Sequence, residues 1–84
     1  MAEKNFMALA DELRQRIPTN GTFSSLNVDV FADEDGIYCA PAESGIAGYP
    51  GSIHYVEEIV LFAKYHDLSV ITEVFDKGAG LKLW

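Results

Sequence analysis

The chain has 84 residues, of which 49% are hydrophobic and 23% are charged, and its formal net charge is −7. This composition indicates a globular rather than a disordered chain, and the length suits one domain, residues 1–84, with a small core. No apolar run is long enough to span a bilayer, and the N-terminus lacks the layout of a signal peptide, so we expect neither a membrane span nor secretion. A lone cysteine, Cys39, excludes an internal disulfide and predicts a reducing compartment, the cytoplasm.

The negative charge is concentrated in the middle of the sequence. Residues 1–16 and 59–84 each balance acids against bases, so residues 17–58, which contain no lysine or arginine, carry the whole net charge. A protein that grips a phosphate backbone needs the opposite sign, and an anionic membrane surface would repel this one. We therefore expect no direct nucleic-acid partner and no membrane partner. The acids of the segment are Asp29, Asp33, Glu34, Asp35, Glu43, Glu57 and Glu58.

The first half of the chain predicts a helix and two strands. Apolar residues recur at helical spacing over Glu3–Arg16 and Pro18 ends that helix, so one face carries Phe6, Leu9, Ala10, Leu13 and Ile17. Alternation predicts a strand over Ser25–Phe31 and another over Ile37–Ala40, which Pro41 ends or leaves at an edge. Residues 33–36 read as the hairpin loop between them, with a glycine able to take positive φ.

The second half predicts a connection, a helix and two more strands. Ala42–Gly51 is long and glycine-rich, and Ser52 is placed to cap a helix that ends at His66. Two adjacent apolar stripes on this helix predict that more than half of it is covered. Period-two alternation then predicts a strand over Leu68–Phe75, a turn over Lys77–Gly80 and a final strand over Leu81–Trp84, hairpinned to the one before.

The element order α-β-β-α-β-β predicts an α+β two-layer sandwich: a mainly antiparallel four-stranded sheet with two helices on one face. The order of the strands stays open. The other sheet face would be rich in aromatic side chains, and exposed apolar patches of that kind mark interfaces. The alternatives are that one strand is shifted by a residue or that the long connection covers the face. The expected residues of that face are Phe31, Tyr38, Ile71, Phe75 and Trp84, mixed with Asn27, Asp29, Glu73 and Lys82.

The acidic run of residues 33–35, with Asp29 nearby, suits either a docking patch for a basic partner or a solvated hairpin tip. It has a calcium-loop element, Asp33-x-Asp35-Gly36. Aligned on that glycine, however, such a loop would begin at Phe31 and end at Ala42, so both essential carboxylates are missing. We expect no metal site here.

The connection Gly45–Gly51 precedes a predicted helix N-terminus, where backbone amides can hold an anion. Its glycines are spaced as in neither the dinucleotide fingerprint nor the phosphate-binding loop, which favours a crossover without a cofactor. Tyr49 in its middle is a candidate exposed anchor.

Cys39 and His54 are the only pair that suits a nucleophile and a base. Cys39, however, falls on the core side of its strand, where a cysteine is usually a small hydrophobe. His54 falls in a first helical turn and His66 at a helix C-terminus. Two histidines and one cysteine this far apart do not form a zinc pattern. Catalysis is not favoured either, because no geometry supports the pair.

These patterns favour a non-enzymatic, acidic protein-binding module without a cofactor, and its sharper form is an inhibitor or regulator that presents carboxylates where a basic partner expects phosphates. Small acidic proteins of phages and other mobile elements act in this way as nucleic-acid mimics, an analogy of size and charge. The rivals are a homodimer formed through the open sheet face or an edge strand Leu81–Trp84, and a small-molecule carrier with Gly45–Gly51 as its lid. The expected partner-binding residues are Asp29, Asp33, Glu34, Asp35, Glu43, Phe31, Tyr38, Tyr49, Phe75 and Trp84.

Overall fold

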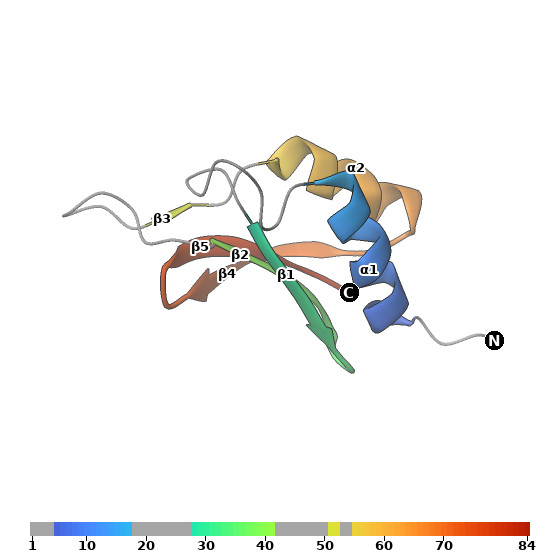
Figure 1. Ribbon diagram of the computed structural model, residues 1–84, viewed down its shortest axis with the longest axis horizontal. Helices are drawn as coiled ribbons and strands as arrows, with labels where there is room; N and C mark the ends of the chain where they lie inside the picture. Colours follow the sequence, from blue (N-terminus) through green and yellow to red (C-terminus); the bar gives the residue numbers. More distant parts are fainter. Residues whose placement is uncertain (1–4, 18–27, 42–50, 53–54) are drawn as a thin grey trace.

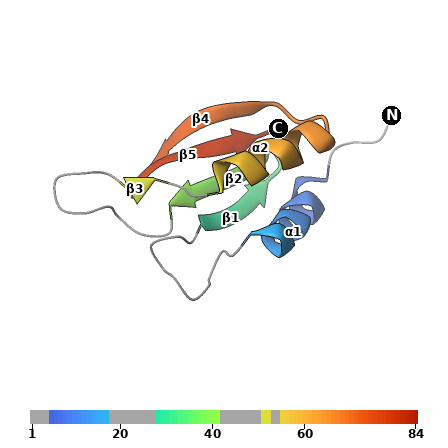
Figure 2. The same ribbon diagram turned by 90° about the horizontal axis from the view of Figure 1, so that it is seen from above.

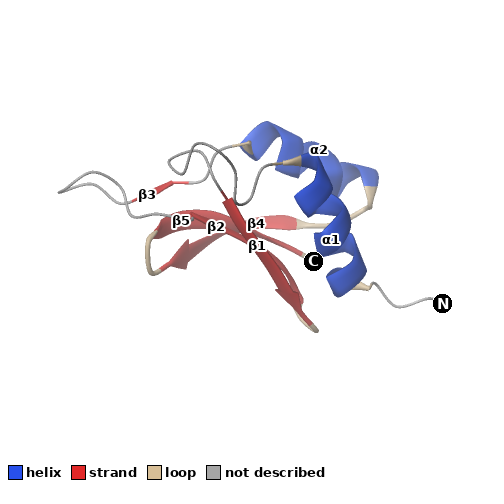
Figure 3. Ribbon diagram, viewed as in Figure 1, coloured by secondary structure: helices blue, strands red, loops and turns tan. Residues whose placement is uncertain are grey.

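The chain folds as one sheet with two helices on one face (Figure 1; Figure 3). The computed structural model describes residues 5–17, 28–41, 51–52 and 55–84. Two helices and four antiparallel strands follow in the order α-β-β-α-β-β, which confirms the predicted α+β architecture. A short additional strand, β3 (Gly51–Ser52), was not predicted.

Helix α1 spans Phe6–Arg16 and turns its apolar stripe toward the sheet. It begins later than the predicted Glu3, because the Asn5 side chain caps it by accepting a hydrogen bond from the Ala8 amide at 3.1 Å. The predicted apolar face is confirmed, with Ala10, Leu13 and Ile17 buried and with Phe6 and Leu9 packed against them.

Strands β1 (Val28–Asp33) and β2 (Gly36–Pro41) form the first hairpin. A two-residue turn joins them, and the Asp33 carboxylate accepts a hydrogen bond from the Asp35 amide at 2.8 Å. Because the turn is this tight, Asp33 still pairs with Gly36, and β1 extends beyond the predicted end at Phe31. The predicted start, Ser25–Asn27, lies outside the described residues.

Helix α2 spans Val56–Tyr65 and is shorter than predicted. Ser52 does not cap it: Ser52 belongs to β3, and the helix follows Tyr55, whose backbone is left-handed at φ 64° and ψ 29°. The covered face is also narrower than expected. Ile59, Phe62 and Ala63 are buried, whereas Val56 and Val60, which share a predicted apolar stripe with Ala63, stay 43% and 41% exposed.

Strands β4 (Val70–Phe75) and β5 (Gly78–Leu83) form the second hairpin. The predicted turn over Lys77–Gly80 is wrong, since Asp76 and Lys77 alone make the turn and the glycines lie in β5. Gly78 has a φ of 145°, a conformation that favours glycine, at the point where the chain re-enters the sheet.

The four main strands lie side by side in the order β1-β2-β5-β4, as Figure 2 shows. β4 flanks β5 along its whole length. The other side of β5 is shared, with β2 beside its end and β3 parallel beside its start. The prediction that Leu81–Trp84 forms an edge strand is therefore wrong: β5 is interior, and β1 and β4 are the outer strands.

The core lies between the sheet and the two helices. Its largest fully buried side chains come from all layers, and no polar or charged residue is buried among the described residues. The helix-facing positions of the sheet are the ones that alternation predicted. The fully buried set is Leu13, Ile37, Ile59, Leu83, Val28 and Cys39.

Candidate protein-binding face

The sheet face opposite the helices, called the open face below, carries a row of side chains that crosses all four strands. Phe31 of β1 pairs with Tyr38 of β2, Tyr38 with Lys82 of β5, and Lys82 with Ile71 of β4. Side chains alternate between the two sides of a sheet. Because Ile37 and Leu83, the neighbours of Tyr38 and Lys82, are buried in the core, this row must point away from the helices.

Three aromatic rings on this face pack on one another. Phe31 and Tyr38 stack with ring centroids 5.3 Å apart, and Phe75 meets both edge-on at 6.1 and 6.3 Å. Offset stacks and edge contacts at these distances are favourable beyond simple burial. The sequence prediction that Phe31, Tyr38 and Phe75 share one face is confirmed, and we name these three residues the aromatic cluster.

Small residues beneath the aromatic cluster let the Phe75 ring come close to the sheet backbone. A Cβ atom built on Gly80 would lie 2.7 Å from a carbon of that ring, so the ring occupies the space that a side chain at Gly80 would need. Ala40 of β2 also belongs to the open face and is only 6% exposed. The sequence analysis missed this role of the glycine, although glycine at alternate positions of β5 is a signal for it.

Carboxylates border the aromatic cluster on both outer strands. Asp29 and Asp33 flank Phe31 along β1 on the same face, and Glu73 lies on the same face of β4. Strand geometry places the two aspartates about 13 Å apart, and it places the β1 edge about 14 Å from β4. Negatively charged side chains therefore lie on both sides of the aromatic cluster.

Lys82 is the cation in the middle of the open face. Its ammonium lies 5.4 Å from the centroid of the Tyr38 ring, within the range of a cation–π contact. The contact holds the lysine stem against the sheet and offsets part of the surrounding negative charge.

The remaining predicted partner-binding residues are spread around this face or lie outside the described residues. Glu34 and Asp35 are exposed at the β1–β2 turn, which follows Asp33 of β1. Trp84 is 43% exposed and its Cβ lies near Gly36, which places it on the open face beside that turn. Glu43 and Tyr49 lie outside the described residues, and so does most of the predicted Gly45–Gly51 lid, of which only Gly51 is described.

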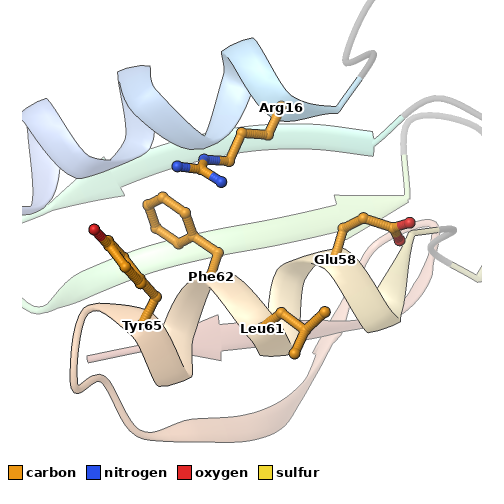
Figure 4. A pocket seen from close by; sticks show the side chains of 5 residues that line it. All are labelled: Arg16, Glu58, Leu61, Phe62 and Tyr65. Carbon is orange, nitrogen blue, oxygen red and sulfur yellow. The ribbon is translucent and has the colours of Figure 1, made fainter.

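A groove of about 730 Å³ lies between α1 and α2, away from the open face (Figure 4). Arg16 of α1 reaches across it and lies 5.7 Å from the centre of the Phe62 ring. Arg16 also pairs with Glu12 at 3.5 Å, one helical turn earlier in α1. Sequence analysis did not identify this groove, because it depends on how two helices distant in sequence meet. Its lining residues are Arg16, Glu58, Leu61, Phe62 and Tyr65.

The predicted chemical residues do not form a catalytic pair in the described part of the chain. His54, predicted in a first helical turn, lies outside it. His66 follows α2, and its Nε2 lies 3.4 Å from a Glu12 carboxylate oxygen without hydrogen-bond alignment. Across residues 5–17, 28–41 and 55–84, no three His, Cys, Asp or Glu side chains gather as a metal site would require.

Cys39 is a core residue, as predicted from its strand position. It is fully buried, and burial raises the pKa of its thiol from about 9 to about 12. A thiol held in its neutral form is a poor nucleophile at physiological pH.

The buried thiol makes the stability of the fold sensitive to alkaline pH. Because the folded pKa lies above the unfolded one, the folded state holds this proton more tightly, and stability is lost as pH rises from about 9 toward 12. We expect the free energy of unfolding, measured with urea, to fall more steeply over this pH range for the unsubstituted chain than for Cys39→Ala. Equal slopes would contradict the assignment. In the folded chain at pH 8, Cys39 should resist thiol reagents until urea unfolds the protein.

Comparison with known proteins found no matching family model, no matching curated protein and no matching solved structure. The helices among the described residues include none that is both long enough and apolar enough to cross a bilayer. The geometry of the open face is therefore the basis for a functional proposal.

Proposed function

We propose that this chain is a non-enzymatic protein-binding module whose open face receives a basic segment of a partner protein. The observation that carries the proposal is the aromatic cluster framed by Asp29 and Asp33 on β1 and by Glu73 on β4. Aromatic faces attract guanidinium and ammonium groups, and carboxylates pair with the same groups. Both parts of the face therefore favour the same kind of partner.

The sharper form of this proposal is an inhibitor or regulator that imitates nucleic acid. Carboxylates on a sheet can occupy a surface where a basic partner otherwise binds phosphates, and the exposed Glu34 and Asp35 at the β1–β2 turn add negative charge next to that face. Electrostatic matching of this kind accelerates association and makes it sensitive to salt. A cytoplasmic location and an origin in phages or other mobile elements belong to this proposal.

A second copy of the chain is a poorer occupant of the open face. Stacking two copies face to face would bring Asp29, Asp33 and Glu73 of both copies into one interface. Like charges held close together oppose association. The dimer through this face is the alternative to this proposal.

The experiment is an NMR titration of the isotope-labelled chain with an arginine-rich peptide of about ten residues and with its glutamate-rich counterpart. We expect only the arginine-rich peptide to bind, with the largest shift changes at Phe31, Tyr38 and Phe75. Replacing Asp29 by asparagine should weaken binding about threefold to tenfold and flatten its salt dependence, because one carboxylate contact is lost.

The matched control is Glu57→Gln, which removes the same charge at an exposed position of α2, on the other side of the molecule. It should leave peptide affinity nearly unchanged. If both variants weaken peptide binding equally, net charge alone explains the effect, and the specific site is contradicted. Shift changes centred on the α1–α2 groove would move the site away from the open face.

A further inference from the structure

The two outer strands of the sheet differ in how their free edges are protected. On β1, the Arg14 side chain donates to the Val30 carbonyl through Nε at 2.9 Å and through Nη2 at 2.6 Å. Asp29 and Asp33 add charge along the same strand. Capped backbone groups and charged side chains are the devices that keep edge strands from pairing with other chains.

The pairing of β4 with β5 fixes which backbone groups of β4 point outward. Ser69 and Trp84 exchange both of their backbone hydrogen bonds at 3.0 Å. Hydrogen-bonded and non-hydrogen-bonded pairs alternate along an antiparallel ladder. Val70, Thr72 and Val74 therefore direct their amides and carbonyls away from β5, toward the outer edge of the sheet.

Among the described residues no strand pairs with that outer edge, which forms one margin of the sheet in Figure 2. The sequence of β4 is apolar apart from Thr72 and Glu73, and its residues other than Glu73 and Phe75 are β-branched. Ile71 is 43% exposed and Val74 is 82% exposed. A six-residue edge strand of this composition is a template for pairing with another strand.

The flank of α2 above β4 is apolar as well. Glu58 and Tyr65 of α2 line the groove toward α1, so Val56 and Val60 lie on the opposite flank by helical spacing. That flank faces the β4 margin, because α1 lies on the β1 side of α2 (Figure 2). Both valines are more than 40% exposed. An apolar surface therefore continues from the free strand edge up onto the helix.

We propose that β4 is the interface between two copies of this chain, paired antiparallel about a twofold axis that passes through Thr72. Outward-pointing residues must pair with outward-pointing residues, so Thr72 meets Thr72 of the second copy and Val70 meets Val74. Each of these pairs exchanges both backbone hydrogen bonds, and Thr–Thr and Val–Val neighbours are favourable on a sheet. The two sheets become one continuous sheet.

The charge of Glu73 selects this register. With the axis at Thr72, Glu73 lies opposite Ile71 of the second copy, and the whole strand takes part. Moving the axis to residue 73 would set the two Glu73 carboxylates directly opposite each other, which is destabilising. Moving it to residue 71 leaves Val74 without a partner. The strand is therefore self-complementary in one register, which identifies a second copy as its occupant.

Cysteine cross-linking tests both the interface and the register. In the proposed dimer the two Thr72 Cα atoms lie about 5.5 Å apart, within the span of a disulfide. Thr72→Cys should therefore form a covalent dimer under mild oxidation. The matched variant Val74→Cys places its two sulfurs on residues about 13 Å apart and should stay uncross-linked. The unsubstituted chain is the background control, because Cys39 is fully buried.

Sedimentation analysis of the unsubstituted chain supplies the second readout. We expect a concentration-dependent dimer. Thr72→Pro should raise the dissociation constant of this dimer at least tenfold, because proline removes an outward amide that does not bond to β5. Met7→Lys, at an exposed position of α1, should leave the dimer intact. A monomer at every concentration up to the millimolar range, or cross-linking of Val74→Cys in preference to Thr72→Cys, would overturn the proposal. Phe31→Ala should not affect dimerisation, so this test is separate from that of the open face.

Discussion

Replacing Gly80 by alanine is expected to lower the free energy of unfolding by about 3 kcal/mol, a large effect for one added methyl group. The new Cβ would overlap the Cys39 carbonyl oxygen and lie 2.7 Å from a ring carbon of Phe75. The ring can rotate away, but the carbonyl belongs to β2, which pairs with β5. The backbone must therefore shift at the centre of the sheet.

Urea unfolding followed by circular dichroism measures this effect. Ala79→Ser is the matched control, because Ala79 is the exposed neighbour of Gly80 in β5 and points to the other face. It should change stability by less than about 0.5 kcal/mol. The double variant Gly80→Ala with Phe75→Leu should recover only part of the loss, since the clash with the carbonyl remains. Full stability of Gly80→Ala would mean that the Phe75 ring does not rest on this glycine.

Replacing Leu13 by alanine is expected to cost about 2–5 kcal/mol of stability. Leu13 is fully buried in the core cluster and belongs to α1, the helix that lies over the first hairpin (Figure 1). Its removal leaves a cavity that the strands beneath cannot fill without losing their pairing. For a domain of this size the loss is a large share of the total stability, which is about 5–15 kcal/mol for natural domains.

The matched control for Leu13 lies in the same helix. Met7→Ala removes a side chain of similar size that is 59% exposed, so it should change stability by less than about 1 kcal/mol. Thermal and urea unfolding of both variants compare the loss of a buried side chain with the loss of an exposed one in the same helix. Similar losses in the two variants would indicate that α1 does not pack on the sheet as described.

The two surfaces proposed to bind are connected through β4. Glu73 and Phe75 point to the open face, while the outward backbone groups of Val70, Thr72 and Val74 form the edge. A dimer through this edge would place two open faces side by side on one continuous sheet. A basic partner would then meet both aromatic clusters, and binding at one would raise the effective concentration at the other.

Local periodicity was sufficient to predict much of this fold. The stripe from Phe6 to Ile17 and the alternation within each main strand depend only on neighbouring residues, because side-chain direction follows from helix or strand geometry alone. For that reason the sequence alone predicts the fold class and the common face of Phe31, Tyr38 and Phe75, whose rings are in contact.

Tertiary structure decided the remaining features, because they depend on partners distant in sequence. Ser52 has the chemistry of a helix cap, but it pairs beside the start of β5 instead. Leu81–Trp84 reads as a terminal edge strand, yet β5 runs between β2 and β4. Alternation predicts which way a side chain points, but the order of the strands determines which residues lie beside it. Strand order therefore placed acids on both borders of the aromatic cluster and made β4, rather than β5, an outer strand of the sheet.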